Sequence, residues 1–231
     1  MTLLTMIVGI SSMATRLLLN EMAAAYRQKC GTRVTFESMG GVDAAQRVQA
    51  GEPYDLAVLA TDAIAKLISS GCILADSKTD LVRSPVVIAI RKGTPRPDIS
   101  SEKALLDTVR AARTLGYSTG PSGTALLKLF ERWGILDKLQ ERIVQAPPGI
   151  PVGKLVAEGK VELGFQQYSE MMDVPGVDIV GPMPAECAIF STFTAGLCNT
   201  SRQPEAVRDL IAYMHSPGTA DAKRRYGMEP A

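Results

Sequence analysis

The sequence predicts an α/β fold in two units, each built from a parallel β-sheet with helices on both faces. Short continuous apolar runs alternate along the chain with segments that carry apolar residues at helical spacing. With right-handed crossovers, this alternation gives a parallel sheet that is covered on both sides. Two longer apolar runs, at residues 84–92 and 189–198, lie where the chain would cross between the units. They divide the 231 residues into one unit of 1–83 plus 195–231 and another of 84–194.

The first unit is predicted from three strand–helix repeats in the first 75 residues. Residues 4–10 are a continuous apolar run, as a strand buried on both faces requires. Residues 13–29 then place Leu18 and Met22 on one face of a helix that Gly31 ends. The same reasoning predicts strands at 32–38 and 55–59 and helices at 42–50 and 62–70, the last with Thr61 as its N-cap.

The second unit repeats the alternation after a longer strand and a Pro-rich turn at residues 84–95. Glycine and proline mark most of the ends of its elements, because neither residue suits the interior of a helix or strand. Further strands are predicted at 114–117, 143–145, 161–166, 179–180 and 189–198, and helices at 101–112, 124–133, 152–158, 204–215 and 219–226.

Charge and hydropathy exclude two classes of partner. The formal net charge is +1 and the basic residues are scattered, so we expect no nucleic-acid partner. No apolar run reaches about 18 residues, so we expect no insertion into a membrane. Residues 3–10 are apolar but lack a basic leader and a small-residue cleavage site. The sequence therefore fits a cytoplasmic protein if Met1 is the native start, or a periplasmic protein whose signal peptide has been removed.

Residues that usually serve catalysis or metal binding are sparse. The four cysteines are widely spaced without a C-x-x-C motif, so we expect free and mostly buried thiols, two disulfides being the alternative. The only histidine, His215, is near the end of a predicted helix, where it suits the helix dipole. Neither G-x-S-x-G nor a phosphate-loop motif occurs. We therefore expect no metal site and no cofactor.

Four turns between a strand and a helix share a composition of serine, threonine and glycine. They lie at residues 9–13, 38–41, 119–123 and 148–152. Such residues cap helices in many proteins, but they also leave first-turn N–H groups open to an anion. In open α/β sheets, ligands bind beyond the carboxyl ends of the strands, where these turns fall. The four turns together predict an anion pocket in a cleft between the two units.

Gln166 and Gln167 end a predicted strand as two adjacent amides. The period of two along a strand turns one side chain toward the cleft and the other toward the opposite side. A glutamine in the cleft would donate a hydrogen bond to an anion or a carbonyl oxygen.

Five stretches of the chain resemble a known family. They are ISSMA, ESMGGVDAAQRVQAGEPYDLAVLA, GPSGTALLKLFERWGI, VAEGKVELGFQQYSE and SPGTADAKRRYGMEP, and together they span nearly the whole chain. The chain resembles the type 2 periplasmic-binding-protein fold, and most closely its molybdate-binding-protein-like branch. The resemblance implies two α/β lobes joined by two crossing strands, which close over a small oxyanion in an interlobe cleft.

The resemblance also implies which residues hold the anion, through hydroxyl and backbone N–H groups. Gln167 stands where molybdate binders typically carry a tyrosine, and Pro151 removes an N–H group near another contact. These departures suit a carboxylate ligand at least as well as molybdate or tungstate. Matched motif by motif, the implied ligand-binding residues are Ser11, Ser12, Ser38, Gly40, Ser122, Gly123, Gly149, Ile150 and Gln167.

Two functions follow from the resemblance. The first is capture of a small anion for delivery to the permease of an ABC transporter, which requires export. The second is isomerisation of a small polycarboxylate by an allylic proton shift, because the branch is similar to aconitate isomerase. Candidate bases are Glu37, Tyr168 and Glu170, and Arg16 would pair with a second carboxylate. A cytoplasmic anion sensor ranks last, since no DNA-binding segment is appended.

Overall fold

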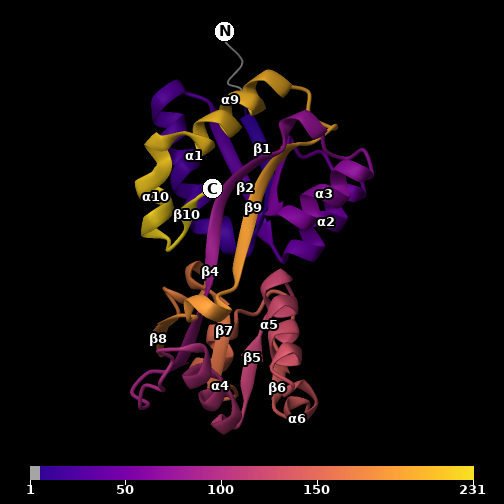
Figure 1. Ribbon diagram of the computed structural model, residues 1–231. Coiled ribbons are helices and arrows are strands. Elements are labelled where there is room, and N and C mark those ends of the chain that lie inside the picture. The colour runs from indigo at the N-terminus through magenta and orange to yellow at the C-terminus, as the bar shows by residue number, and fades with distance from the viewer. Residues whose placement is uncertain (1–5) are drawn as a thin grey trace. The chain divides into compact units, whose positions relative to one another are not determined.

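The computed structural model describes residues 6–231, which form two compact units (Figure 1). Unit 1 holds the chain up to Arg83 together with Thr192–Ala231, and unit 2 holds Ser84–Ser191. Strands β4 (Thr79–Arg91) and β9 (Phe190–Leu197) each contain residues of both units. The predicted first strand is present from Met6, while its residues 4 and 5 lie outside the described part of the chain.

Unit 1 contains a sheet whose strands follow the order β2-β1-β3-β9. Strand β1 (Met6–Ser12) pairs in parallel with β2 (Arg33–Met39) and β3 (Leu56–Ala60), and β3 pairs antiparallel with β9. The short β10 (Glu229–Pro230) pairs antiparallel with β4. The helices of this unit are α1 (Arg16–Cys30), α2 (Gly41–Gln49), α3 (Thr61–Ser69), α9 (Pro204–His215) and α10 (Ala220–Arg225), with 3-10 turns at Met13–Thr15, Ala75–Ser77 and Pro217–Thr219.

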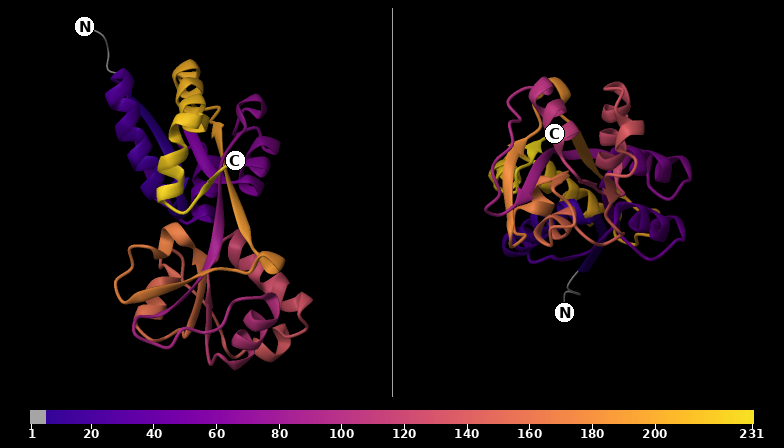
Figure 2. Two further views of the ribbon diagram at one scale, coloured as in Figure 1. Left: turned by 60° about the vertical axis from the view of Figure 1, so that its left-hand side comes forward. Right: turned by 90° about the horizontal axis from the view of Figure 1, so that it is seen from below.

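Alternating side chains of β3 show how both faces of this sheet are buried. Leu56 and Val58 pack in the cluster that includes α1 and α9, while Ala57 and Leu59 pack with α2 and α3. Figures 1 and 2 show these helices on opposite sides of the strands. All four side chains are fully buried, as a strand covered on both faces requires.

Unit 2 contains a second sheet with the order β4-β7-β5-β6. Strand β5 (Leu115–Tyr117) pairs in parallel with β6 (Ile143–Gln145) and β7 (Leu163–Gln167), and β4 pairs antiparallel with β7 and with β8 (Val177–Pro182). Its helices are α4 (Glu102–Ala111), α5 (Pro121–Arg132), α6 (Leu136–Leu139), α7 (Val152–Ala157) and α8 (Tyr168–Met171), with a 3-10 turn at Ala185–Cys187.

The faces of this second sheet determine where the two adjacent glutamines point. Leu163 and Phe165 of β7 pack in the cluster that contains residues of α4 and α5. Two residues further along the strand, Gln167 therefore lies on the α5 side. Gln166 lies on the opposite side, where Val87 packs with residues of α7 and α8.

Three predicted boundaries were wrong for identifiable reasons. Helix α5 begins at Pro121 rather than residue 124, because proline has the backbone angle that the first helical position needs. Thr61 is the first residue of α3 rather than its N-cap, and no side chain caps this helix. Strand β4 begins at Thr79 instead of residue 84, since Leu81 and Val82 are buried between its charged neighbours.

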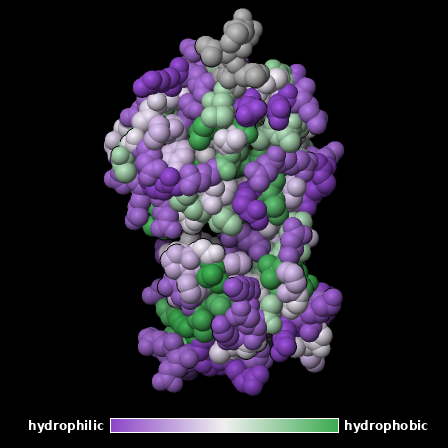
Figure 3. Space-filling view, turned by 180° about the vertical axis from the view of Figure 1, so that it is seen from behind, coloured by the Kyte–Doolittle hydropathy of each residue, from purple (hydrophilic) through white to green (hydrophobic). Residues whose placement is uncertain are grey.

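The surface and the cysteines agree with the composition. Polar residues cover most of the face in Figure 3, and hydrophobic residues appear in small groups. Within residues 6–231, no helix combines the length and the apolar character that crossing a membrane needs. All four cysteines are free thiols: Cys187 and Cys198 are buried, Cys72 is half-buried and Cys30 is exposed.

Candidate functional site

Two serines meet at the carboxyl ends of neighbouring strands in unit 1. Ser11 of β1 is in register with Ser38 of β2, and their Oγ atoms lie 2.8 Å apart. Ser11 is fully buried and Ser38 is half-buried. Either hydroxyl can be the donor in this contact, so the pair uses one of its two protons internally and has one left for another acceptor. The two hydroxyls thus orient each other.

Ser12 and Gly40 start helices without capping them through side chains. Ser12 precedes the 3-10 turn that leads into α1, and its carbonyl accepts a hydrogen bond from Thr15 Oγ1 at 3.1 Å. Gly40 is the N-cap of α2, and its carbonyl accepts from the N–H of Ala44 at 2.9 Å. The first-turn N–H groups of α2 therefore have no side-chain cap and carry the partial positive charge of a helix N-terminus.

Four polar side chains form a hydrogen-bonded chain in unit 2. The hydroxyl of Ser122 lies 3.1 Å from Ser118 Oγ and 3.4 Å from Gln167 Oε1. Gln167 Nε2 donates to Ser191 Oγ at 3.0 Å. Ser122, Gln167 and Ser191 are all buried. The chain brings together residues of α5, β7 and β9 that lie far apart in the sequence.

The start of α5 explains one of the predicted glycines. A Cβ on Gly123 would lie 1.9 Å from the carbonyl oxygen of Ser118, so the backbone of this protein already excludes any larger residue there. Gly120 is the N-cap and no side chain caps the helix. The motif caps the helix through the backbone carbonyl of Gly120, which accepts from the N–H groups of Gly123 and Thr124 at 3.0 and 3.2 Å, while the Ser118 and Ser122 hydroxyls contact each other.

The turn before α7 uses one of its N–H groups internally. Gly149 is exposed and has a φ of +77°, a left-handed conformation that glycine favours. The N–H of Ile150 donates to the carbonyl of Pro147 at 3.0 Å, and its side chain packs against the core of unit 2. Ile150 is therefore not a free donor in this structure, which leaves Gly149 as the candidate contact of this turn.

Gln166 links the start of α7 to Glu170. Its Oε1 accepts from the N–H of Val152 at 2.7 Å, and its Nε2 donates to Glu170 Oε1 at 2.8 Å. Burial of the carboxyl raises the pKa of Glu170 from 4.5 to about 7, although the hydrogen bond from Gln166 opposes this shift. A carboxyl with a pKa near neutrality accepts and returns a proton readily, so Glu170 is the strongest candidate base.

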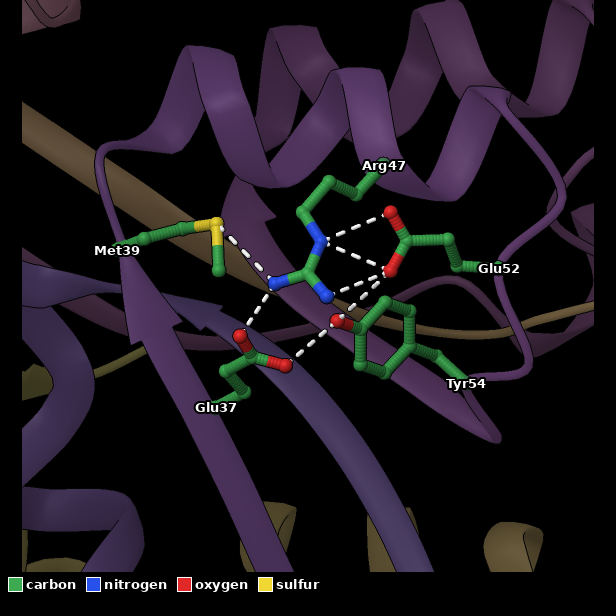
Figure 4. A network of polar contacts seen from close by, with 5 residues as sticks. All are labelled: Glu37, Met39, Arg47, Glu52 and Tyr54. Carbon is green, nitrogen blue, oxygen red and sulfur yellow. Dashed lines mark hydrogen bonds and ion pairs between the residues drawn. The ribbon is translucent and has the colours of Figure 1, made fainter.

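Glu37 instead belongs to a structural network (Figure 4). Arg47 of α2 pairs with Glu37 and binds Glu52 through two hydrogen bonds of 2.8 and 2.9 Å. Tyr54 donates to Glu37 at 2.7 Å, and Met39 Sδ also faces Arg47. The guanidinium of Arg47 and then the hydroxyl of Tyr54 hold the pKa of Glu37 below its usual value. This carboxylate is engaged by the fold and poorly suited to proton abstraction.

The remaining candidates differ in what surrounds them. Tyr168 begins α8 and packs, partly buried, against the apolar cluster of α7. Arg16 begins α1 and is exposed; its backbone N–H donates to the carbonyl of Met13, and its side chain makes no hydrogen bond or ion pair within the described part of the chain. Arg16 is therefore available to a second negative group, whereas Tyr168 contributes to the core.

Sequence reasoning missed a second chain of hydroxyls in unit 1. Thr61 Oγ1 lies 2.8 Å from Thr194 Oγ1 and 3.2 Å from the carbonyl of Thr192. Thr194 in turn donates to Asp80 Oδ1 at 2.5 Å. Sequence reasoning also missed Ser118 and Ser191, although the polar Ser191 within an apolar run was a visible signal.

Comparison with known proteins places the chain in a family. The profile of the bacterial extracellular solute-binding proteins matches residues 7–229. The chain belongs to this family. A relative by sequence is the aconitate isomerase of a Pseudomonas species, 35% identical over 217 residues, which cover 92% of this chain and 83% of the relative.

Solved structures of other solute-binding proteins share the fold. The periplasmic molybdate-binding protein of Azotobacter vinelandii has a TM-score of 0.79 at 20% identity, covering 96% of this chain and 98% of that one. The sulfate-binding protein SubI of Mycobacterium tuberculosis also reaches 0.79, at 17% identity and with 98% and 87% covered. The predicted α/β two-lobed fold and the resemblance to molybdate-binding proteins are thus confirmed.

Proposed function

We propose that this solute-binding protein binds a small anion through uncharged hydroxyl and backbone N–H donors. The observation that carries the proposal is the Ser11–Ser38 pair, which has one hydroxyl proton left to donate near the start of α2, a helix without a side-chain cap. Helix N-termini and hydroxyl donors are a general means of holding anions without a counter-ion. The start of α5 in unit 2 likewise has no side-chain cap.

The class of anion that these residues suit best is a small carboxylate. A relative with 35% identity is named for aconitate, a polycarboxylate. Arg16 is exposed and unpaired within the described residues, and an arginine fork matches the two oxygens of a carboxylate. Oxyanions such as molybdate or sulfate remain the alternative class, because proteins of the same fold are named for them.

Calorimetric titration of the purified protein tests this proposal. cis-Aconitate, trans-aconitate, molybdate and sulfate are titrated separately, with thermal shift as a second readout. Ser38→Ala should weaken binding by about tenfold or more, since a hydrogen bond to a charged group contributes roughly 1.5–3 kcal/mol. Ser69→Ala is the matched control, because Ser69 is exposed at the end of α3 and donates to Ala65. If none of the four anions binds, the proposal is contradicted.

A second candidate function is isomerisation of a small polycarboxylate. Glu170 favours it, since a buried carboxyl with a pKa of about 7 suits the removal and return of one proton. Neutral N–H donors would stabilise the charge that develops on the substrate carboxylate during the shift.

The protein is incubated with cis-aconitate, and conversion of this substrate is followed by chromatography and by ultraviolet absorbance. Glu170→Gln should abolish the conversion while binding is retained, and Glu141→Gln, which changes an exposed glutamate of unit 2, should leave it unchanged. No conversion by the unaltered protein, with binding intact, would assign it to capture alone. For an exported capture protein, we propose the permease of an ABC transporter as the partner.

A further inference from the structure

The amide of Gln167 is engaged at both ends by buried hydroxyl groups. Its Nε2 donates to Ser191 Oγ at 3.0 Å, and its Oε1 accepts from Ser122 Oγ at 3.4 Å. Gln167 is only 4% exposed. One of the two N–H groups of its amide is therefore used by Ser191, and its oxygen is used by Ser122.

Counting protons shows what this arrangement does to the neighbouring serines. Each hydroxyl has one proton to donate. Ser122 gives its proton to Gln167, so the 3.1 Å contact between Ser118 and Ser122 must use the proton of Ser118. In this state neither of the two hydroxyls has a proton for a ligand.

Turning the amide by half a rotation reverses the direction of the chain. Nε2 then donates to Ser122, and Ser191 donates to Oε1, so that the number of hydrogen bonds is unchanged. The proton of Ser122 then points either to Ser118 or to a ligand. In the first case the proton of Ser118 is available to a ligand, so the pair has one proton to donate in both cases. The two states satisfy the buried groups equally well, and an anion favours the second because its oxygen needs a donor.

We propose that Gln167 is a positioning residue whose amide orientation decides whether the Ser118–Ser122 pair donates or accepts. Selection of a deprotonated ligand oxygen by unit 2 then depends on the rotation of one buried amide. The inference rests on the proposed anion binding, and it assigns the contact to the serines and the switching to Gln167.

Two substitutions at Gln167 distinguish this role from direct contact. Gln167→Glu supplies oxygens that only accept while the introduced carboxyl is ionised, which holds both hydroxyl protons inward. Gln167→Met has a similar length but no polar group, so it releases the proton of Ser122. We expect the first to weaken binding by about tenfold or more and the second by less than about threefold.

A double-mutant cycle separates the proton direction from the added charge. Titrations with cis-aconitate and with molybdate compare Gln167→Glu in the native background and beside Ser122→Ala, after circular dichroism has established folding. The penalty of Gln167→Glu should fall below about threefold when Ser122 is absent. It should also shrink as the pH is lowered and the introduced carboxyl is protonated.

The outcomes are distinct. An undiminished penalty beside Ser122→Ala, or an equal loss with Gln167→Met, would overturn the positioning role while leaving anion binding intact. Failure of the unaltered protein to bind either probe would instead overturn the proposed function and this inference with it.

Discussion

Replacing Glu170 with glutamine should change how stability depends on pH. The pKa of Glu170 in the folded protein is about 7, against an ordinary value of 4.5, because the carboxyl is buried. The folded state therefore binds a proton more tightly than the unfolded state. Stability from this group is fully present below about pH 4.5 and is lost as the pH rises to about 7.

The size of the effect follows from the two pKa values of Glu170, 4.5 and about 7. Each step of one in pKa corresponds to about 1.4 kcal/mol, so the loss of stability is at most about 3–4 kcal/mol. Glu170→Gln keeps an oxygen that accepts from Gln166 Nε2 but cannot ionise. The variant should therefore lack most of the decline in stability between acid and neutral pH, whatever its stability at one chosen pH.

Urea unfolding at a series of pH values measures this decline. The free energy of unfolding is compared for the unaltered protein, Glu170→Gln and the exposed control Glu141→Gln. The control should follow the unaltered protein. A Glu170→Gln curve parallel to both would show that the carboxyl titrates as in water and that its burial has no energetic consequence.

Three other substitutions test packing and burial, each by urea unfolding. Ser84→Ala should raise the free energy of unfolding by about 1 kcal/mol, since Ser84 Oγ is buried and the one such side-chain atom without a partner in residues 6–231. Gly123→Ala should lower it by about 2 kcal/mol or more, because a Cβ would meet the Ser118 carbonyl at 1.9 Å. Lys223→Met should stabilise the protein, because Lys223 is 1% exposed and burial lowers its pKa; the gain should shrink as the pH approaches 10.5. For each variant, a change of the opposite sign in the free energy of unfolding would contradict the stated reason.

The order of helices and strands was predictable because the sequence pattern indicates which strands are buried on both faces and where helices end. Continuous apolar runs identified the strands that are buried on both sides, such as β3. Gly31 adopts a φ of +79° after α1, which is the conformation expected of a glycine that ends a helix. The start of α5 was missed because Pro121 and Ser122 read as a turn, while their backbone is already helical.

The candidate site was only partly predictable, because hydrogen bonds depend on register and on distant residues. The meeting of Ser11 and Ser38 follows from adjacent parallel strands that end together. The partners of Gln167 do not, because Ser122 and Ser191 lie 45 and 24 residues away and three elements must pack to bring them together. The burial of the Glu170 carboxyl is likewise a property of the packed fold, which the polar residues before it in the sequence did not indicate.

The proton arrangement explains how a nearly neutral protein can favour an anion. Two paired hydroxyls use one of their two protons between them, so the Ser11–Ser38 pair has one proton left to donate. A ligand oxygen without a proton accepts from such a group, whereas a ligand hydroxyl competes with it as a second donor. Selectivity then rests on the protonation of the ligand, and a net charge of +1 is no obstacle to binding. Recognition by fixed neutral donors also avoids burying a cation that would have to lose its hydration.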